Sequence, residues 1–481
     1  MGIDIGTSTF KAGLFQRDGR CIRRSAQPLP IESSGGRYEA DPAQWLRAFT
    51  AALDSLGSLA AVRALAVSGN GPTLVPVIGT PSLAGGELRV PAEQARLWLD
   101  RRAQAESQTI SAIAGGFVDP SFVLPKALFI KNRENALYER TRYFFSSSEY
   151  LAYALTGEAR TVFPSAGFDR WYWNDRTLEA AGLAKEKFPP FVFPGELIGR
   201  VSKAASARFG FPPDLRVFAG GPDFFAAILG TGTIRPGQTC DRSGTSEGVN
   251  VCTQDRIVDP RLMSYGHPAK PFWNCSGIIA TSGKALSWGR SVGGMEALPY
   301  RAFYGLAASA AAGAGGVVFL PYLAGERSPI WDSRARGAFL GLDLNTRRAE
   351  LARAVAEGVC FAIRDVLSVI RDLGAGVSEL RVTGGPAESS FLNQLKADIC
   401  GLPVLRPRMP EAELLGLTAI SAAALGIYAS AAEAAEQLVE IGDRFYPQEA
   451  LASRYDRLFG VYRGAYQALK GQFEALSRLA E

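Results

Sequence analysis

The sequence predicts an α/β protein of two domains with mixed sheets, and three observations carry this prediction. The chain has 481 residues, more than one domain of ordinary size contains. Each half opens with short strands and continues with alternating helices and strands, which is typical of α/β domains. A Gly-Thr-Ser turn with an upstream aspartate lies between two strands near the start and again in the middle, at Gly6 and Gly244. We therefore expect two domains, 1–230 and 231–481, built on one plan.

The first half carries clear local signals for its elements. Asp18-Gly19 between apolar runs predicts a hairpin. Asp41 before Pro42 predicts the start of a helix that runs to about residue 57, and Ser146 with Glu149 forms a capping pair for another. The predicted strands are 2–5, 11–15, 21–25, 62–67 and 217–221. The predicted helices are 42–57, about 92–112, 126–140 and 148–155.

The second half repeats this pattern. Predicted strands lie at about 238–242, 248–252, 316–320 and 380–383, and predicted helices at 346–373 and 388–400 and within 411–440 and 455–480. The stretch 306–325 has no charge and is long enough to span a bilayer. It is mostly Ala and Gly and ends in Pro321-Tyr322, so we expect a buried helix followed by a strand there.

Composition excludes several classes of function. The net charge is only +5 and basic residues never run beyond pairs, which argues against a nucleic-acid partner. The six cysteines form no Cys-x-x-Cys pair and no secretory signal opens the chain, which predicts a reducing, cytoplasmic compartment and no membrane partner. His267 is the only histidine, so three-histidine zinc sites are excluded and proton transfer is expected to fall to a carboxylate.

Familiar catalytic motifs fit poorly. A Walker loop and a Gly-x-Gly-x-x-Gly fingerprint are both missing. The pentapeptide 244–248 matches the nucleophile elbow of serine hydrolases, and this class is the rival hypothesis. It would need His267 as base, with Asp255 or Asp259 as acid. An elbow also needs a helix after Ser246, whereas 248–252 alternates like a strand.

Three features can be interpreted in two ways. The two Gly-Thr-Ser turns could hold a polyphosphate with backbone N–H groups and hydroxyls, or could reflect a common turn composition. Asp223 follows a buried strand, where a helix N-cap is common but where α/β folds also place their ligands. The segment 98–102 carries a charged triplet, which is either a solvated face or part of a site.

Several motifs together resemble the FGGY family of carbohydrate kinases, most closely its xylulokinase-like members. The segment 4–11 (DIGTSTFK) is similar to the family's first phosphate segment, and 243–246 (SGTS) to its second. The segment 320–329 (LPYLAGERSP) resembles a specific family hallmark. It is followed by the signature region 337–357, in which Ala356 replaces a larger apolar residue, and by 383–398, which resembles the adenosine segment. The resemblance covers nearly the whole chain.

The resemblance implies an actin-like ATPase (ribonuclease H-like) fold with an ATP cleft between duplicated domains, and transfer of a phosphoryl group from Mg²⁺-ATP to a sugar hydroxyl. Asp223 takes the place of the catalytic base and Asp4 that of the aspartate near the magnesium. Asp100 falls at a sugar-binding position, with Arg102 and Asn70 beside similar ones. The implied nucleotide-binding residues are Gly6, Thr7, Ser8, Thr9, Lys11, Gly244, Thr245, Ser246, Gly384, Gly385, Pro386 and Asn393.

Four departures qualify the comparison. Phe224 follows the base where relatives have Asn or Gln, and Gly69-Asn70 replaces a Met-His pair. Pro386 stands where a third glycine is usual, and Met1 leaves the first strand short, as a misplaced start codon would. We expect a kinase of a ketopentose such as xylulose or of a related polyol. The alternatives are a kinase of another sugar or sugar acid and a catalytically weak nucleotide-binding member. A homodimer is a further hypothesis.

Overall fold

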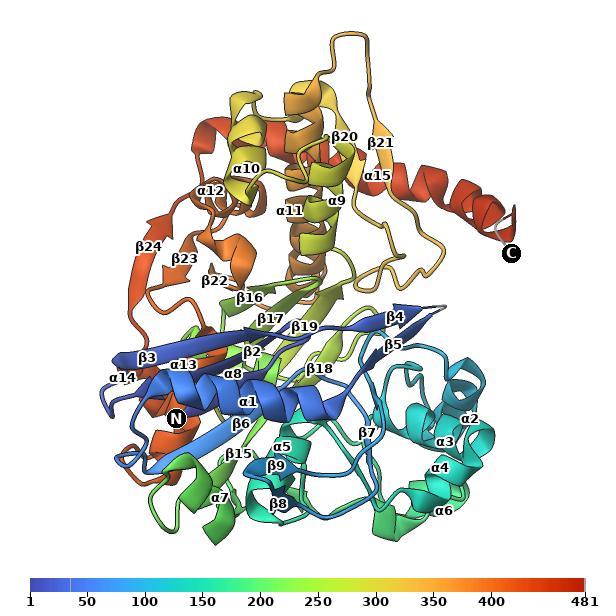
Figure 1. Ribbon diagram of the computed structural model, residues 1–481. Helices are drawn as coiled ribbons and strands as arrows, with labels where there is room; N and C mark the ends of the chain where they lie inside the picture. Colours follow the sequence, from blue (N-terminus) through green and yellow to red (C-terminus); the bar gives the residue numbers. More distant parts are fainter. Residues whose placement is uncertain (35, 480–481) are drawn as a thin grey trace. The chain divides into compact units, whose positions relative to one another are not determined.

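The chain divides into two compact units, seen in the computed structural model of Figure 1, which describes residues 1–34 and 36–479. Unit 1 comprises Met1–Gly230 and Glu413–Leu438, and unit 2 comprises Thr231–Ala412 and Val439–Glu481. The two units therefore differ from the expected domains 1–230 and 231–481, because the helical segment Glu413–Leu438 packs with the first unit.

Unit 1 combines a large sheet with helices and several short strands. Its strands are β1 (Gly2–Ile5), β2 (Thr9–Phe15), β3 (Cys21–Pro28), β4 (Glu32–Ser34), β5 (Arg37–Ala40), β6 (Ala64–Gly69), β7 (Val75–Val77), β8 (Ser82–Ala84), β9 (Glu87–Arg89), β10 (Ala95–Arg96), β11 (Tyr143–Phe145), β12 (Thr161–Val162), β13 (Phe191–Val192), β14 (Leu197–Arg200) and β15 (Arg216–Pro222). Its helices are α1 (Pro42–Leu56), α2 (Gln104–Ala114), α3 (Val123–Arg133), α4 (Asn135–Arg140), α5 (Ser147–Thr156), α6 (Asp175–Ala180), the 3-10 turn η1 (Lys185–Lys187), α7 (Lys203–Phe209), α8 (Asp223–Gly230), α13 (Ala412–Ala424) and α14 (Ala431–Leu438).

Unit 2 has the same kind of architecture. Its strands are β16 (Gln238–Ser243), β17 (Glu247–Thr253), β18 (Met263–Gly266), β19 (Trp273–Ile279), β20 (Val318–Leu320), β21 (Ala338–Leu340), β22 (Glu379–Thr383), β23 (Val404–Pro407) and β24 (Ile441–Phe445). Its helices are α9 (Gly283–Val292), α10 (Tyr300–Ser309), η2 (Ala314–Gly316), α11 (Arg348–Asp372), η3 (Gly385–Glu388), α12 (Ser390–Cys400) and α15 (Glu449–Leu479).

The main sheets of the two units share one strand order. Unit 1 has the order β14-β15-β6-β1-β2-β3, in which β1, β6 and β15 are parallel and the β1–β2 hairpin carries the first Gly-Thr-Ser turn. Unit 2 has the order β24-β23-β22-β16-β17-β19 with β18 added at its edge; there β16, β22 and β23 are parallel and the β16–β17 hairpin carries the second turn. The repeated turn thus marks a repeated fold, as expected for duplicated domains.

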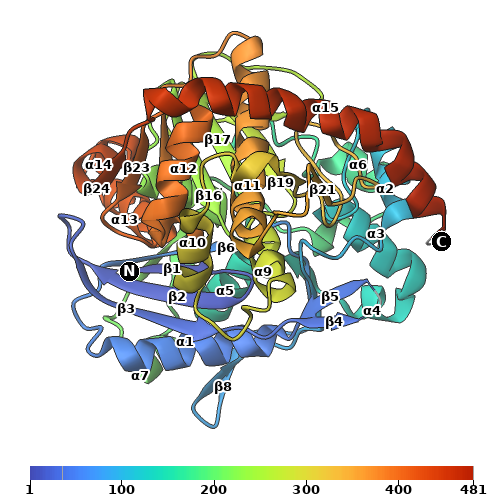
Figure 2. The same ribbon diagram turned by 90° about the horizontal axis from the view of Figure 1, so that it is seen from above.

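Apolar faces explain how helices cover each sheet. In unit 1, α1 lies along β2 and β3 (Figure 1) and meets α5 through Trp45 and Tyr150, whose ring centroids are 6.1 Å apart. On the other face α13 approaches the strands closely, since a Cβ at Gly2 would lie 2.9 Å from the Leu414 carbonyl oxygen. In unit 2, α11 packs on β17 and β19, and α15 runs across α11 and α12 (Figure 2).

Several predicted elements are confirmed and others are wrong. The helix opened by the Ser146–Glu149 capping box forms, and so does the hairpin at Gly19. The predicted helix 92–112 is wrong in its first half: it contains β10 and a loop before α2 begins at Gln104. The predicted helix 126–140 is two helices that break at Glu134.

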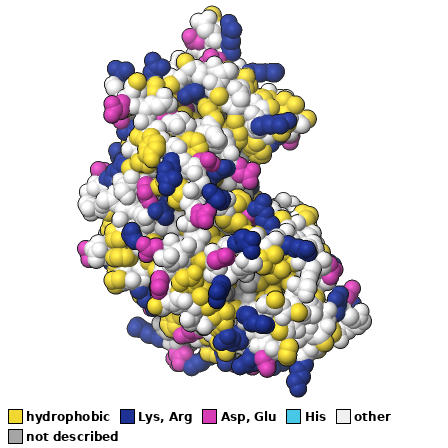
Figure 3. Space-filling model, turned by 90° about the vertical axis from the view of Figure 1, so that its left-hand side faces the viewer, with side chains coloured by type: hydrophobic (Ala, Val, Ile, Leu, Met, Phe, Trp, Pro, Cys, Tyr) yellow, Lys and Arg dark blue, Asp and Glu magenta, His cyan; other side chains and the backbone are white. Residues whose placement is uncertain are grey.

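The uncharged stretch 306–325 does not form a single long helix. It holds the end of α10, a 3-10 turn and strand β20. Among the described residues, no helix is both long and apolar enough to cross a membrane. On the face shown in Figure 3, Lys and Arg side chains are dispersed among Asp and Glu side chains.

Candidate active site

The predicted site residues of unit 1 gather at one edge of its sheet. The parallel strands end in register there, since Ile5 of β1 pairs with Gly69 of β6, and Gly69 pairs with Pro222 of β15. The next residues along the chain are therefore Gly6, Asn70 and Asp223. The carboxyl edge of parallel strands is where α/β proteins bind ligands. Three predicted residues from distant parts of the sequence thus share this edge.

The first turn is a compact backbone structure that requires glycine. The Gly6 N–H donates to the Thr9 carbonyl oxygen at 3.0 Å, and a Cβ at Gly6 would lie 2.8 Å from that oxygen. The Thr7 hydroxyl accepts a hydrogen bond from Trp98 Nε1 at 2.9 Å. Trp98 therefore links the turn to the predicted substrate segment 98–102.

The Asn70 side chain holds this turn in place through hydrogen bonds to its backbone. Its Nδ2 donates to the carbonyl oxygens of Ile5 and Gly6 at 2.9 and 3.1 Å, and its Oδ1 accepts a hydrogen bond from the Thr73 hydroxyl. The side chain is 2% exposed, and both amide hydrogens are used by the backbone. Asn70 thus positions the turn, and its predicted contact with the sugar stays a prediction.

Asp4 lies in a group of carboxylates that has little positive charge. It is buried, opposite Lys11 in the strand register, and accepts a hydrogen bond from the Ser68 hydroxyl at 2.8 Å. Burial raises the pKa of Asp4 to about 7; the charges of Glu413 and Asp223 add to this rise and Lys11 opposes it. The Lys11 ammonium also lies 3.9 Å from the Glu413 carboxylate. A cation near Asp4 would relieve this crowding.

The donor set around Asp4 fits magnesium held partly by a substrate. No group of three or more His, Cys, Asp or Glu side chains among the described residues could hold a metal alone. Mg²⁺ usually binds through one or two carboxylates together with phosphate oxygens and water. Carboxylate oxygens without a full protein cage are therefore suitable for a metal that arrives with a nucleotide.

Asp223 is held at the junction of β15 and α8. Gly220 allows the close approach of β15 to β6, since a Cβ there would lie 2.4 Å from the Val67 carbonyl oxygen, and Gly221 has a φ of +86°. The Phe224 N–H donates to Asp223 Oδ1 at 2.7 Å, which orients the carboxylate. The Phe224 ring stacks on Phe168 with centroids 6.3 Å apart and an interplanar angle of 21°. An aromatic surface thus follows the candidate base directly.

Asp100 and Arg102 form a rigid pair in the loop after β10. Arg102 Nε donates to both carboxylate oxygens of Asp100 at 3.0 Å, and its Nη2 also donates to Glu39 on β5. Burial by itself would raise the pKa of Asp100, but the hydrogen bonds from Arg102 outweigh it and hold that pKa below its ordinary value. Asp100 is therefore ionised and fixed in direction, as a group that accepts hydrogen bonds from hydroxyls must be.

Lys126 of α3 fixes the segment that leads to Asp100, and sequence reasoning missed it. Its ammonium donates to the carbonyl oxygens of Pro72, Arg96 and Leu97 at 2.9, 3.2 and 2.7 Å. The side chain is 2% exposed, and burial lowers its pKa to about 7. The only local signal was a lysine within the otherwise apolar start of α3.

The candidate nucleotide segments of unit 2 also meet at the carboxyl edge of parallel strands. Arg242 of β16 pairs with Thr383 of β22, so the turn 244–246 and the loop at Gly384 are neighbours. A Cβ at Gly384 would lie 1.9 Å from the Ser243 carbonyl oxygen, and its φ is +91°. The Gly283 N–H donates to the Gly244 carbonyl oxygen at 2.9 Å and ties the turn to α9. Only glycine permits this packing of backbone on backbone.

The buried side chain of Asn393 holds the loop after Gly384 in place. Gly385 and Pro386 begin the 3-10 turn η3. Asn393 Nδ2 donates to the Ala387 carbonyl oxygen at 2.8 Å, and its buried Oδ1 has no hydrogen-bond partner in the described part of the chain. The direct contact of Asn393 with a nucleotide remains a prediction.

A fully buried ionic cluster lies beneath the second turn, and no sequence motif predicted it. Lys396 of α12 donates to Asp241 Oδ2 at 2.5 Å, to Glu247 Oε1 at 2.6 Å and to the Ser243 hydroxyl at 2.9 Å. Although burial opposes ionisation, Lys396 and the hydrogen bonds hold the pKa of Glu247 at about 2. Burial and Glu247 raise the pKa of Asp241. Lys396 and Glu247 thus form the ion pair that fixes this turn.

The structure excludes the rival hydrolase class. Ser246 is followed by strand β17, so the strand-to-helix elbow does not form. His267 lies in the turn after β18, where its Nδ1 accepts a hydrogen bond from the Ala269 N–H at 3.0 Å. Burial lowers the pKa of His267 to about 3. The only histidine is thus a structural residue.

Fold and site together define a class of protein. Each unit has the same strand order and a glycine turn at the carboxyl edge of its parallel strands, with hydroxyls and buried carboxylates beside it. The backbone N–H groups that are not bonded within such turns can bind phosphates, and the carboxylates suit proton transfer and metal binding. This combination is that of a two-unit α/β phosphotransferase.

The comparisons specify the family. The model of the N-terminal domain of the FGGY family of carbohydrate kinases matches residues 1–230, and that of the C-terminal domain matches residues 242–425. The chain belongs to the FGGY family of carbohydrate kinases. It is therefore a sugar-phosphorylating kinase with ATP as its phosphoryl donor, as the resemblance implied.

Relatives match over nearly the whole length. Xylulose kinase from Staphylococcus epidermidis is 27% identical over 98% of this chain and 97% of its own. Glycerol kinase from Rhodospirillum rubrum is 29% identical over 98% of both chains. The solved structure of xylulose kinase from Rhodospirillum rubrum, 26% identical, superposes with a TM-score of 0.82 over 98% of this chain and 99% of that chain. The predicted actin-like ATPase fold is confirmed.

Proposed function

We propose that this kinase transfers the γ-phosphoryl group of Mg²⁺-ATP to a hydroxyl of a ketopentose such as xylulose, or of a related polyol. The observation that carries the proposal is the shared sheet edge at which Gly6, Asn70 and Asp223 follow strands that end in register. The two relatives described above, a xylulose kinase and a glycerol kinase, are both named for polyhydroxy substrates.

We assign the two parts of the reaction to the two halves of the chain. The segment 1–230 supplies the sugar-binding residues and the first phosphate segment, with Gly6, Thr7, Ser8, Thr9 and Lys11. The segment 231–481 supplies the second phosphate segment and the adenosine segment. Its nucleotide-binding residues are Gly244, Thr245, Ser246, Gly384, Gly385, Pro386 and Asn393.

In the proposed mechanism Asp223 accepts the proton of the substrate hydroxyl while that oxygen attacks the γ-phosphorus in line. The ionised Asp100 accepts hydrogen bonds from neighbouring hydroxyls, and Arg102 keeps its carboxylate in place. Phosphoryl transfer demands positioning and charge stabilisation above all, so no histidine is needed. Asp4 is the residue that would hold Mg²⁺, which supplies positive charge to the phosphate oxygens.

Two features favour a second candidate, a kinase of another sugar or of a sugar acid. The amide hydrogens of Asn70 are used by the backbone, and Phe224 presents a ring next to the base where an amide could have met a hydroxyl. Both features reduce the number of polar groups available to a sugar.

A coupled ADP-release assay across ketoses, polyols and aldonates separates these candidates. Asp223→Asn is expected to lower kcat by about 10²- to 10⁴-fold, the usual contribution of a general base, without loss of ATP binding. Asp214→Asn is the matched control, because Asp214 is exposed and its φ of +63° suits asparagine. ATP binding without sugar-dependent ADP release for any acceptor would overturn the kinase proposal.

We also propose a cytoplasmic location and a homodimer. Cys252, Cys275, Cys360 and Cys400 are buried free thiols, which fits a reducing compartment. Light scattering of the purified chain tests the oligomeric state, with the mass of a single chain as the contradicting result.

A further inference from the structure

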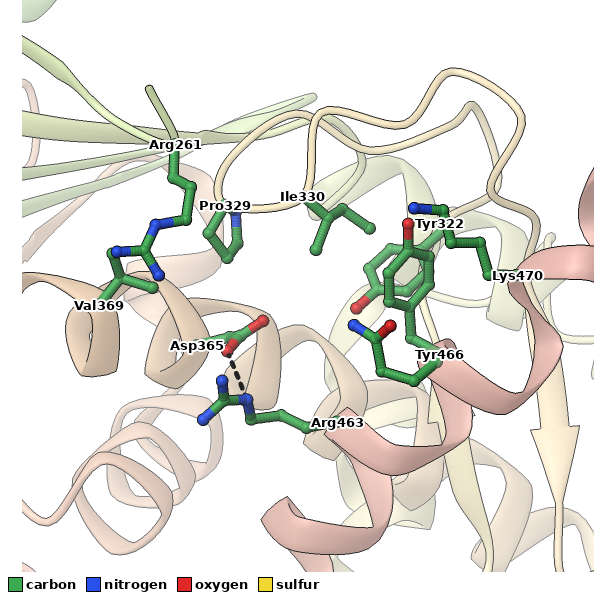
Figure 4. Close-up of a pocket in the computed structure, with 10 residues that line it drawn as sticks. Arg261, Tyr322, Pro329, Ile330, Asp365, Val369, Arg463, Tyr466 and Lys470 are labelled. Atoms are coloured by element: carbon green, nitrogen blue, oxygen red, sulfur yellow. Dashed lines mark ion pairs between the residues drawn. The ribbon is translucent and has the colours of Figure 1, made fainter. Parts of the chain in front are cut away.

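A cavity of about 260 Å³ lies in unit 2 between α11, α15 and the loop after β20 (Figure 4). Arg261, just before β18, closes one side. Strands β19 and β17 separate β18 from β16, which carries the second glycine turn. The cavity is therefore separate from the nucleotide segments of this unit.

A buried carboxylate is directed into this cavity. Asp365 of α11 has a side chain that is 9% exposed, and Figure 4 shows its carboxylate turned toward the open space. Its nearest cation is Arg463 of α15, with Nε 3.4 Å from Oδ1. The described residues provide no hydrogen bond to this carboxylate, which leaves its oxygens able to accept bonds from hydroxyl groups.

Three cations line the cavity together with this carboxylate, one from the segment before β18 and two from α15. Arg261 is oriented by two hydrogen bonds of 2.8 Å to Asp259, and Arg463 and Lys470 lie on one face of α15 (Figure 4). Burial raises the pKa of Glu326, on the loop beside the cavity, to about 8, which favours the neutral form of this carboxyl. With Arg261 paired with Asp259 and Arg463 beside Asp365, the ammonium of Lys470 leaves the cavity with a net positive charge, which attracts an anion.

Aromatic rings and aliphatic side chains form the remaining wall. The Tyr322 hydroxyl donates to that of Tyr462 at 2.8 Å, and the Tyr466 hydroxyl donates to Asp332 at 3.0 Å. Because both hydroxyls are engaged elsewhere, the two tyrosines offer their rings, together with Pro329 and Ile330, to the carbon skeleton of a ligand.

We propose that this cavity is a second binding site, for a small phosphorylated sugar. Guanidinium groups recognise phosphate oxygens in a fixed geometry, and Arg261, Arg463 and Lys470 supply the charge for such a group. Asp365 accepts hydrogen bonds from the sugar hydroxyls, and the tyrosine rings pack against its carbon atoms. The site does not depend on which acceptor the kinase phosphorylates.

Calorimetry on the full chain tests the site with ribose 5-phosphate, ribose and inorganic phosphate as probes. Ribose 5-phosphate is expected to bind at least tenfold more tightly than either of the other two. Lys470→Glu is expected to weaken it at least tenfold, whereas Arg457→Glu, an exposed charge reversal on the same helix outside the cavity, leaves it unchanged. Asp365→Asn is expected to weaken ribose 5-phosphate but not inorganic phosphate.

Hydrogen exchange locates the ligand, since a sugar phosphate could also enter the catalytic site. Protection of residues 459–473 by ribose 5-phosphate, lost in Lys470→Glu, is expected. Equal affinity in wild type and Lys470→Glu, equal affinity for inorganic phosphate, or protection confined to unit 1 would each overturn the proposal. ADP release measured in parallel tests the proposed kinase function separately, because the binding readout requires no turnover.

Discussion

The ion pair beneath the second glycine turn leads to a quantitative prediction for Lys396→Met. This substitution removes the ammonium that lies 2.6 Å from Glu247 and 2.5 Å from Asp241, all fully buried. The folded variant must then keep Glu247 protonated, because an unpaired buried charge is more costly still.

The cost follows from the pKa of the unfolded chain. Protonating a carboxyl with an ordinary pKa of 4.5 at pH 7 costs about 3 kcal/mol, at about 1.4 kcal/mol per pH unit. In the variant the folded pKa of Glu247 lies above the unfolded value, so the loss of stability grows as the pH rises above 4.5. At pH 5 the loss is expected to shrink to about 1 kcal/mol.

Urea unfolding of the full chain at pH 5 and pH 7, followed by circular dichroism, measures this difference. The matched control is the double variant Lys396→Met/Glu247→Gln, which removes the carboxyl as well and is expected to regain most of the lost stability at pH 7. An equal loss at both pH values, or a double variant no more stable than the single one, would refute the reasoning.

Three further predictions concern the candidate site. Arg102→Gln should raise the pKa of Asp100 and raise KM for the sugar about tenfold, without a change in KM for ATP. The rise in KM should be larger at pH 6 than at pH 8, and a rise that is independent of pH would contradict the role given to this pair. Trp98→Phe removes one hydrogen bond to Thr7, worth about 1 kcal/mol, and should lower kcat/KM about fivefold in steady-state assays, whereas an unchanged value would show that this link is dispensable. Gly384→Ala places a Cβ 1.9 Å from the Ser243 carbonyl oxygen and should abolish ATP binding in calorimetry. The control is Gly374→Ala, because Gly374 has a φ of +89° but a Cβ there would meet no atom within 4 Å. Equal affinity for ATP in the two variants would contradict the role of this close packing.

Elements with a complete local signal were predictable. The capping residues of α5 and the turn residues of the hairpin at Gly19 interact with backbone only a few residues away, so neighbouring sequence positions are enough to predict their geometry. The helix predicted at 92–112 was wrong because Arg96 and Trp98 are fixed by tertiary contacts: Arg96 exchanges backbone hydrogen bonds with Leu74, and Trp98 bonds to Thr7. Local propensity could not anticipate these partners.

Within the site, residue types were easier to predict than their tasks. The motif at 4–11 identified the turn and Asp223 stood out at a strand end, but Asn70 proved to use its amide on the carbonyl oxygens of Ile5 and Gly6. Lys126 was missed because its ordinary appearance in a helix says nothing about burial. The role of a side chain depends on the groups that it contacts, and these groups belong to distant segments of the sequence.

Short motifs were enough to predict the two repeated turns, the strands that open each half and the membership of a kinase family, because the physics of such motifs is local. Only the folded chain brings Glu413 to Asp4 and Lys11, although it lies some four hundred residues later, and places Lys396 against Glu247 beneath the second turn. Charges on distant segments interact only once folding has buried them together, where water no longer screens them. The electrostatics of the site is therefore a property of the fold.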